Sequence, residues 1–196
     1  LEEAARRLRY DFLRQEAEKL GQHIKIYTAH HADDNAETIL FNLIRGTGVA
    51  GLTGMAYQQN GICRPLLDVT REELAAYAAA RHIPHVEDTT NADPGAAARN
   101  FLRLEVMPRL RQINPRAVEH INDAGRRLRV ADQSLEEEAA RRTAHVEVQE
   151  GRVTLSRQAL AEATDAVRPR MLLRLFDLLG VGRRDITAAH LQDILH

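Results

Sequence analysis

The sequence is poor in cysteine, in lysine and in long hydrophobic runs. Its single cysteine, Cys63, excludes an intrachain disulfide framework and fits the reducing cytoplasm. Cys63 follows an apolar residue in a predicted strand, which is more typical of a core thiol than of a nucleophile. No segment approaches the ~20 apolar residues that cross a bilayer, so we predict no membrane span. Residues 1–4 show no signal-peptide pattern, and the absence of GxSxG, HExxH and CxxC leaves serine hydrolases, zinc proteases and zinc ribbons without support.

The remaining composition is that of a globular protein. The chain has 196 residues, 44% of them hydrophobic and 28% charged, which is enough for one large domain or two small ones. Of the 27 basic residues 25 are arginine, a bias that GC-rich codons explain more readily than phosphate or carboxylate binding does. The net charge is −1, but residues 99–129 contain eight arginines against three acidic residues. That segment is either a surface for an anionic partner or a solvated helix face.

Hydrophobic periodicity divides the chain near Asn114. Before it, helical and strand patterns alternate, as in α/β proteins, whereas the residues after it are mostly helical. The patterns predict strands over 24–29, 62–67 and 84–87, helices over 2–20, 36–45, 71–81, 97–110, 116–143, 168–179 and 187–196, and a small hairpin over 145–155. We therefore expect domains over 1–113 and 114–196. Three short strands are few for a doubly wound sheet, and both ends fall inside helical patterns, so we expect a fragment.

The strongest candidate site follows the first predicted strand. His30, His31, Asp33, Asp34 and Glu37 lie where open α/β sheets bind ligands, and a helix starting near Ala32 places several of them on one side. Converging carboxylates there suit Mg²⁺ beside a nucleotide. The alternative is that the two aspartates only cap the helix, but two histidines and a glutamate exceed what a cap requires.

A second polar cluster spans residues 87–91 and continues to Arg99 and Arg103. The two arginines are one helical turn apart, so they share a face that is suited to clamping phosphate or stabilising developing charge. An ordinary loop-to-helix junction would explain the same residues. The glycine-rich segment 46–55 must be a loop, and it lacks the spacing of a P-loop or a dinucleotide-binding fingerprint.

Five segments in register resemble the tRNA(Ile)-lysidine synthases, a MesJ-type PP-loop family. They are RRLRYDF (6–12), HHADDNAET (30–38), LIRGTGVAGLTGM (43–55), RPLL (64–67) and EDTTNADPGAAARNFLR (87–103). The resemblance is dense over about the first 110 residues and loose beyond them. It implies a partial adenine-nucleotide alpha-hydrolase-like, Rossmann-like parallel sheet domain, followed by a mostly helical substrate domain that contains the small hairpin.

The same resemblance implies a cytoplasmic two-step ligase that uses ATP and Mg²⁺. ATP adenylates the C2 oxygen of the wobble cytidine in a tRNA(Ile) with a CAU anticodon, and the amine of L-lysine then displaces AMP. By this resemblance Asp34, Glu37, Asn91 and Arg103 are catalytic, with Asp34 also a candidate Mg²⁺ ligand. Arg6, Arg9, His30, His31, Asp33 and Arg99 are then candidates for binding nucleotide or tRNA.

The sequence departs from the family at one important motif. The phosphate-binding signature SGGxDS is absent, and residue 35 is asparagine where the family usually has glutamine. We therefore expect the chain alone to be inactive. The edges of a partial sheet favour self-pairing, which leaves a homodimer open.

Three alternative functions stay open at this point. Another PP-loop enzyme, such as a tRNA thiolase, usually needs more cysteines than one. A non-catalytic tRNA-binding module would show salt-dependent binding. An unrelated HHxDD metallohydrolase would hold Zn²⁺ or Mn²⁺ tightly.

Overall fold

A computed structural model describes residues 2–21, 24–84, 98–149, 151–183 and 186–195. Its contacts divide the chain into two compact units, Leu1–Leu128 and Arg129–His196, which are described separately below. No helix of the described residues is long and apolar enough to cross a membrane.

The sheet of the first unit is small and mixed. Strand β1 (Ile26–Tyr27) pairs in parallel with β3 (Ile62–Cys63), and β2 (Gln58–Gln59) pairs antiparallel with β3, in the order β1-β3-β2. We predicted a parallel sheet and did not predict β2. The turn at Asn60 and Gly61, both with positive φ, connects β2 directly to β3 and allows only antiparallel pairing. Of the third predicted strand, residues 85–87 lie outside the described residues.

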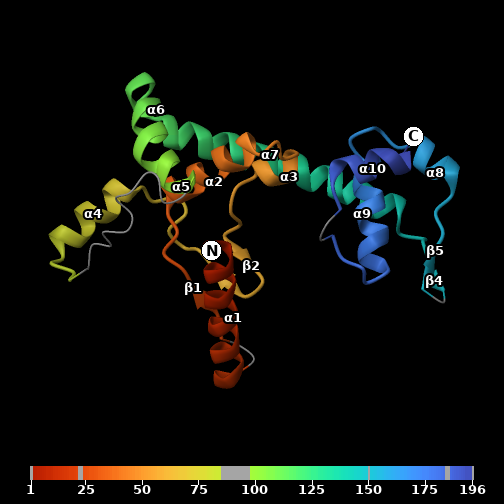
Figure 1. The fold of residues 1–196 in the computed structure, drawn as a ribbon, viewed down its shortest axis with the longest axis horizontal. Coiled ribbons are helices and arrows are strands. Elements are labelled where there is room, and N and C mark those ends of the chain that lie inside the picture. The colour runs from red at the N-terminus through yellow and green to blue at the C-terminus, as the bar shows by residue number, and fades with distance from the viewer. Residues whose placement is uncertain (1, 22–23, 85–97, 150, 184–185, 196) are drawn as a thin grey trace. The chain divides into compact units, whose positions relative to one another are not determined.

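The other regular elements of the first unit are helices, the first of which lies beside the sheet (Figure 1). They are α1 (Glu2–Leu20), α2 (Ala32–Ile44), α3 (Val49–Leu52), α4 (Arg71–Ala80), α5 (Ala98–Phe101), α6 (Met107–Ile113) and α7 (Ala117–Arg142). Between α5 and α6 the chain continues as a π-helical segment, Leu102–Val106. The short helix α3 corrects our prediction that residues 46–55 are loop throughout. Gly48, in an extended conformation, is the N-cap of this helix. The side-chain amide of Asn42 donates to the carbonyl oxygen of Gly51 at 2.7 Å and so ties α3 to α2.

The core of the first unit lies between α2, α6 and the first half of α7. Ala32, Ala36, Met107 and Val118 are buried together there. Gly125 of α7 allows a close approach to α2, because a Cβ at this position would lie 2.7 Å from Ile39 Cδ1. This packing explains why the compact units divide within α7, later than the boundary that we predicted at 113/114.

The second unit is mostly helical. It contains the end of α7, the predicted hairpin as β4 (Val148–Gln149) and β5 (Arg152–Val153), and the helices α8 (Arg157–Ala161), α9 (Arg168–Leu178) and α10 (Ala188–Leu195). Its core contains Ala139, Val167 and Met171, of which Ala139 and Met171 are fully buried. Arg170 connects α9 to α7, since its Nη2 lies 2.6 Å from the Asp132 carboxylate.

Gly54 provides a prediction on stability. Its φ is +70°, and an added Cβ would lie 2.5 Å from Asn35 Oδ1, so both conformation and space exclude a side chain. We expect Gly54→Ala to lower the free energy of unfolding by about 2 kcal/mol in urea denaturation. Gly48→Ala is the control, because a Cβ at Gly48 meets nothing within 4 Å. Equal losses in the two variants would contradict the account.

The start of α4 provides a prediction on pH dependence. Thr70 and Glu73 form a capping box, in which the backbone N–H and the hydroxyl of Thr70 both donate to the Glu73 carboxylate at 2.7 Å. These bonds hold the pKa of Glu73 below its usual value. A lowered carboxyl pKa means that the cap is fully formed at neutral pH and is lost as the pH falls through that pKa. An NMR titration should show the Glu73 pKa rising in Thr70→Val; an unchanged pKa would contradict the assignment.

Candidate active site

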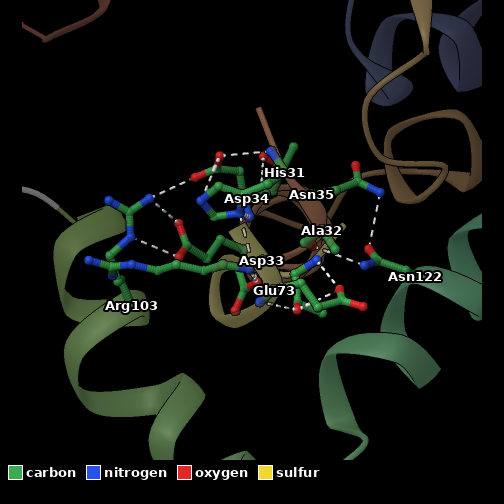
Figure 2. A network of polar contacts seen from close by, with 12 residues as sticks. His31, Ala32, Asp33, Asp34, Asn35, Glu73, Arg103 and Asn122 are labelled. Carbon is green, nitrogen blue, oxygen red and sulfur yellow. Dashed lines mark hydrogen bonds and ion pairs between the residues drawn. The ribbon is translucent and has the colours of Figure 1, made fainter. Parts of the chain in front are cut away.

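The candidate site is built at the N-terminus of α2, directly after β1. His31 is the N-cap of this helix: its Nδ1 accepts from the backbone N–H of Asp34, and the Asp34 carboxylate accepts from the N–H of His31 at 3.1 Å. His31 is thus the N-cap itself, and Asp34 completes a capping box with it, so one of the two aspartates takes the capping role that we considered for both. The other oxygen of Asp34 and the carboxylates of Asp33 and Glu37 contact other elements (Figure 2).

Arg103 joins two of these carboxylates. Its Nε and Nη2 donate to the two oxygens of Glu37, each at 2.9 Å, and Nη2 also lies 2.9 Å from Asp34 Oδ1. The Glu37 side chain is only 3% exposed, and that of Asp34 is 18% exposed. Two parallel hydrogen bonds from one guanidinium fix the plane of the Glu37 carboxylate as well as its distance. The pKa of Arg103 is raised further above its ordinary value, mainly by the hydrogen bond to Glu37.

The backbone at Arg103 is unusual. Arg103 lies in the π-helical segment that precedes Pro108. In a regular helix the proline ring would clash with the carbonyl group four residues earlier, and a wider turn relieves that clash. The π segment thus sets the direction from which Arg103 reaches α2.

Asp33 connects three elements of the first unit. Its Oδ2 accepts from the backbone N–H of Arg71 at 2.8 Å, at the start of α4, and its Oδ1 pairs with the guanidinium of Arg111 from α6. Asp33 is 6% exposed, and both of its oxygens bind within the protein. We predicted that it contacts nucleotide or tRNA; its observed contacts hold α4 and α6 against α2.

A buried amide network holds the other side of α2 (Figure 2). Asn122 of α7 donates from Nδ2 to the carbonyl oxygen of Ala32 at 2.9 Å and accepts from Asn35 Nδ2 at 3.1 Å. Asn35 Oδ1 in turn accepts from the backbone N–H of Met55 at 2.6 Å. These three bonds fix the start of α2 to α7 and to the glycine-rich segment 46–55.

The other predicted residues are distributed around this cluster. Arg99 donates to Thr38 Oγ1 at 2.8 Å, so it reaches α2 one turn from Arg103. His30 pairs with Thr28, with Nδ1 2.9 Å from the hydroxyl oxygen. Arg9 is exposed on α1, the side chain of Arg6 lies outside the described atoms, and Asn91 lies outside the described residues.

The predicted magnesium ligand does not fit this arrangement. Asp34 and Glu37 already share the guanidinium of Arg103, and the second oxygen of Asp34 accepts from His31. Among the residues that the structure describes, no group of three His, Cys, Asp or Glu side chains converges on one point. Both oxygens of Asp34 therefore bind protein donors in this arrangement and do not form a metal site.

A pocket of about 530 Å³ opens beside the ion pairs. It is lined by residues of α2, α4, the π segment and α6, among them Asp33, Glu37, Arg103 and Arg111. The charged residues of its lining balance, four acidic residues (Asp33, Glu37, Glu72, Glu119) against four arginines (Arg71, Arg103, Arg111, Arg116). The pocket therefore has room for a small molecule that carries both positive and negative groups.

Sequence reasoning missed Arg111 and Asn122. Arg111 stands 78 residues from its partner Asp33, and Asn122 stands 87 residues from Asn35. No local motif marks either residue. The net positive charge of residues 99–129 was the one available signal, and it indicated a surface rather than a buried ion pair.

Comparison of the sequence with known proteins assigns the chain to a family. The family model described as the PP-loop domain matches residues 1–110. Among curated proteins, the chain is similar to the tRNA(Ile)-lysidine synthases of Porphyromonas gingivalis (47% identity over 59% of the chain), Parabacteroides distasonis (44% over 63%) and Pseudomonas aeruginosa (44% over 71%). The matches span 25%, 30% and 32% of those proteins, so the chain covers less than a third of the length of each. By the match of more than half of its residues, the chain belongs to the PP-loop domain family.

Proposed function

We propose that this chain carries part of the active site of a tRNA-modifying ligase that joins L-lysine to the wobble cytidine of tRNA(Ile) with a CAU anticodon. In this reaction ATP first adenylates the C2 oxygen of the cytidine and releases pyrophosphate. The amine of lysine then attacks C2, and AMP leaves with the oxygen. The observation that carries the proposal is the cluster of Asp34, Glu37 and Arg103, found in a chain similar to enzymes of that name.

The ion pairs suit the lysine half of the reaction. Lysine brings two ammonium groups and one carboxylate, and the adjoining pocket is lined by four acidic residues and four arginines, which can pair with both kinds of group. In our proposal the carboxylates of Asp34 and Glu37 orient an ammonium group and take up the proton that the attacking amine loses. Arg103 holds both carboxylates in place before the substrate arrives, so the site need not reorganise during the reaction.

The ATP half of the reaction needs residues beyond those of the cluster. The family described as the PP-loop domain supports ATP use, but the SGGxDS phosphate-binding signature does not occur in the 196 residues. We propose that the phosphate loop is supplied by residues outside this sequence, and that the 196-residue chain by itself transfers no lysine.

Lysine incorporation tests the proposal. The 196-residue chain and a longer protein that includes its natural flanking residues are each incubated with ATP, radiolabelled lysine and a tRNA(Ile) transcript with a CAU anticodon. We expect ATP-dependent label in the tRNA only with the longer protein. A tRNA(Met) transcript, which shares the anticodon, is the control for tRNA choice, and labelled arginine is the control for the amino acid.

Each outcome has a defined meaning. Label in tRNA(Ile) from lysine alone supports the proposal. A longer protein that is folded but transfers no lysine refutes the ligase, and salt-dependent tRNA binding by it would then favour a binding module. Lysine transfer by the 196-residue chain would refute the part of the proposal that places the phosphate loop outside it.

A further inference from the structure

Two charged side chains of the pocket beside Arg103 have no partner among the residues that the structure describes. The lining of this pocket contains four acidic residues and four arginines. Three of each kind pair with one another: Arg103 with Glu37, Arg111 with Asp33, and Arg116 with Glu119. Arg71 and Glu72 are the two charged residues that remain.

The main chain fixes the position from which these two side chains extend. Arg71 and Glu72 are the first two residues of α4, directly after its N-cap Thr70. The backbone N–H of Arg71 donates to Asp33 Oδ2 at 2.8 Å, which holds the first turn of α4 against α2. The side chains of Arg71 and Glu72 are exposed and line the pocket. They are therefore free to bind a ligand from a backbone that is already in place.

The pocket also has an apolar wall. Ala75 of α4, Met107 and Pro115 on either end of α6, and Val118 of α7 contribute to its lining. Such side chains suit a hydrocarbon chain, whereas the unpaired guanidinium and the unpaired carboxylate suit charged groups of opposite sign. The pocket therefore matches a small amino acid with an aliphatic side chain that ends in a charge.

We propose that Arg71 binds the carboxylate of the amino-acid substrate, so that the site selects a free amino acid over its amide. This inference rests on the proposed lysine transfer and names a second contact for the lysine, remote from Glu37. The other three arginines of the lining are held by acidic partners, and binding the substrate through one of them would break an ion pair. The planar fork of Arg71 can donate two parallel hydrogen bonds to a carboxylate.

Kinetics of the longer protein with L-lysine and with L-lysinamide test this assignment. Lysinamide keeps the hydrocarbon chain and both amines but has a neutral amide in place of the carboxylate. We expect Arg71→Ala to raise the KM for lysine about 30-fold with little change in kcat, because the lost contact serves binding rather than the chemical step. The KM for lysinamide should stay within about twofold of that of the parent protein. Arg71→Lys keeps the charge without the fork, so it should recover part of the affinity for lysine.

Arg81→Ala is the matched control. Arg81 is the C-cap of the same helix, is exposed, lies over the ring of Tyr77 and does not line the pocket. This variant should leave the KM for both substrates unchanged. Because the side chain of Arg71 is exposed as well, we expect both alanine variants to unfold at the urea concentration of the parent protein.

Two results would overturn the assignment while leaving the proposed ligase standing. One is a rise in KM that is equal for lysine and lysinamide, because Arg71 would then shape the pocket without touching the carboxylate. The other is a rise in the KM for tRNA(Ile) with an unchanged KM for lysine, because Arg71 would then contact the nucleic acid. Both results require an active parent protein, whereas a folded parent that transfers no lysine refutes the ligase and the role of Arg71 with it.

Discussion

Replacing Arg103 with alanine should lower the free energy of unfolding by about 3 kcal/mol and reduce lysine transfer by at least about 100-fold. The stability loss arises because Glu37, with a side chain only 3% exposed, would keep its charge without a partner. The loss is at the lower end of the range for buried ion pairs, since the Arg103 side chain is itself 22% exposed. Urea denaturation of the chain and lysine incorporation by the longer protein measure the two effects.

Arg109→Ala is the matched control for this variant. Arg109 lies on α6 and pairs with Glu105 at 2.9 Å, but its side chain is 68% exposed. Exposed pairs of this kind contribute little, so we expect a change within about 0.5 kcal/mol and full activity. Equal effects at Arg103 and Arg109 would show that the guanidinium of Arg103 neither stabilises nor positions the carboxylates.

Replacing Asn122 with alanine should destabilise the first unit by a similar amount, about 3 kcal/mol. The substitution leaves the Ala32 carbonyl oxygen without its side-chain donor and Asn35 Nδ2 without an acceptor, both in buried residues. Each buried polar group that loses its partner costs about 1–3 kcal/mol. Because Ala32 begins α2, we also expect slower lysine transfer by the longer protein. Urea denaturation and lysine incorporation again provide the two measurements.

Gln133→Ala separates this network from a general effect on α7. Gln133 is exposed on the same helix and binds only Glu137 among the described residues, at 2.9 Å. We expect its free energy of unfolding to stay within about 0.5 kcal/mol of the parent. If Asn122→Ala unfolds at the same urea concentration as Gln133→Ala, the amide network does not fix α2.

Local sequence patterns were enough to predict most helices of this protein. The helix over 2–20 begins and ends as expected, and the capping box at Thr70 and Glu73 marked the start of α4 correctly. These signals are read within one or two helical turns. The strands were harder, because β1 and β3 are two residues long and β2 has the sequence Gln-Gln, which carries no hydrophobic alternation.

The candidate site was predictable as two halves but not as one cluster. The spacing of Asp34 and Glu37 placed both carboxylates near the start of one helix, and Arg99 and Arg103 both reach α2, as residues one turn apart on a shared face would. What joined them was the family resemblance, since Arg103 lies 66 residues from Glu37 and no local rule connects residues so distant. The π-helical segment that directs Arg103 has no sequence signal beyond Pro108.

The most direct test of the central claim is lysine incorporation by Glu37→Gln in the longer protein. Glutamine keeps the size of the side chain, but it removes the negative charge that binds Arg103 and that we propose orients the lysine amine. We predict a folded protein whose ATP-dependent lysine transfer to tRNA(Ile) falls at least about 100-fold. Transfer at the rate of the parent protein would contradict this prediction, because the carboxylate cluster would then have no part in the reaction.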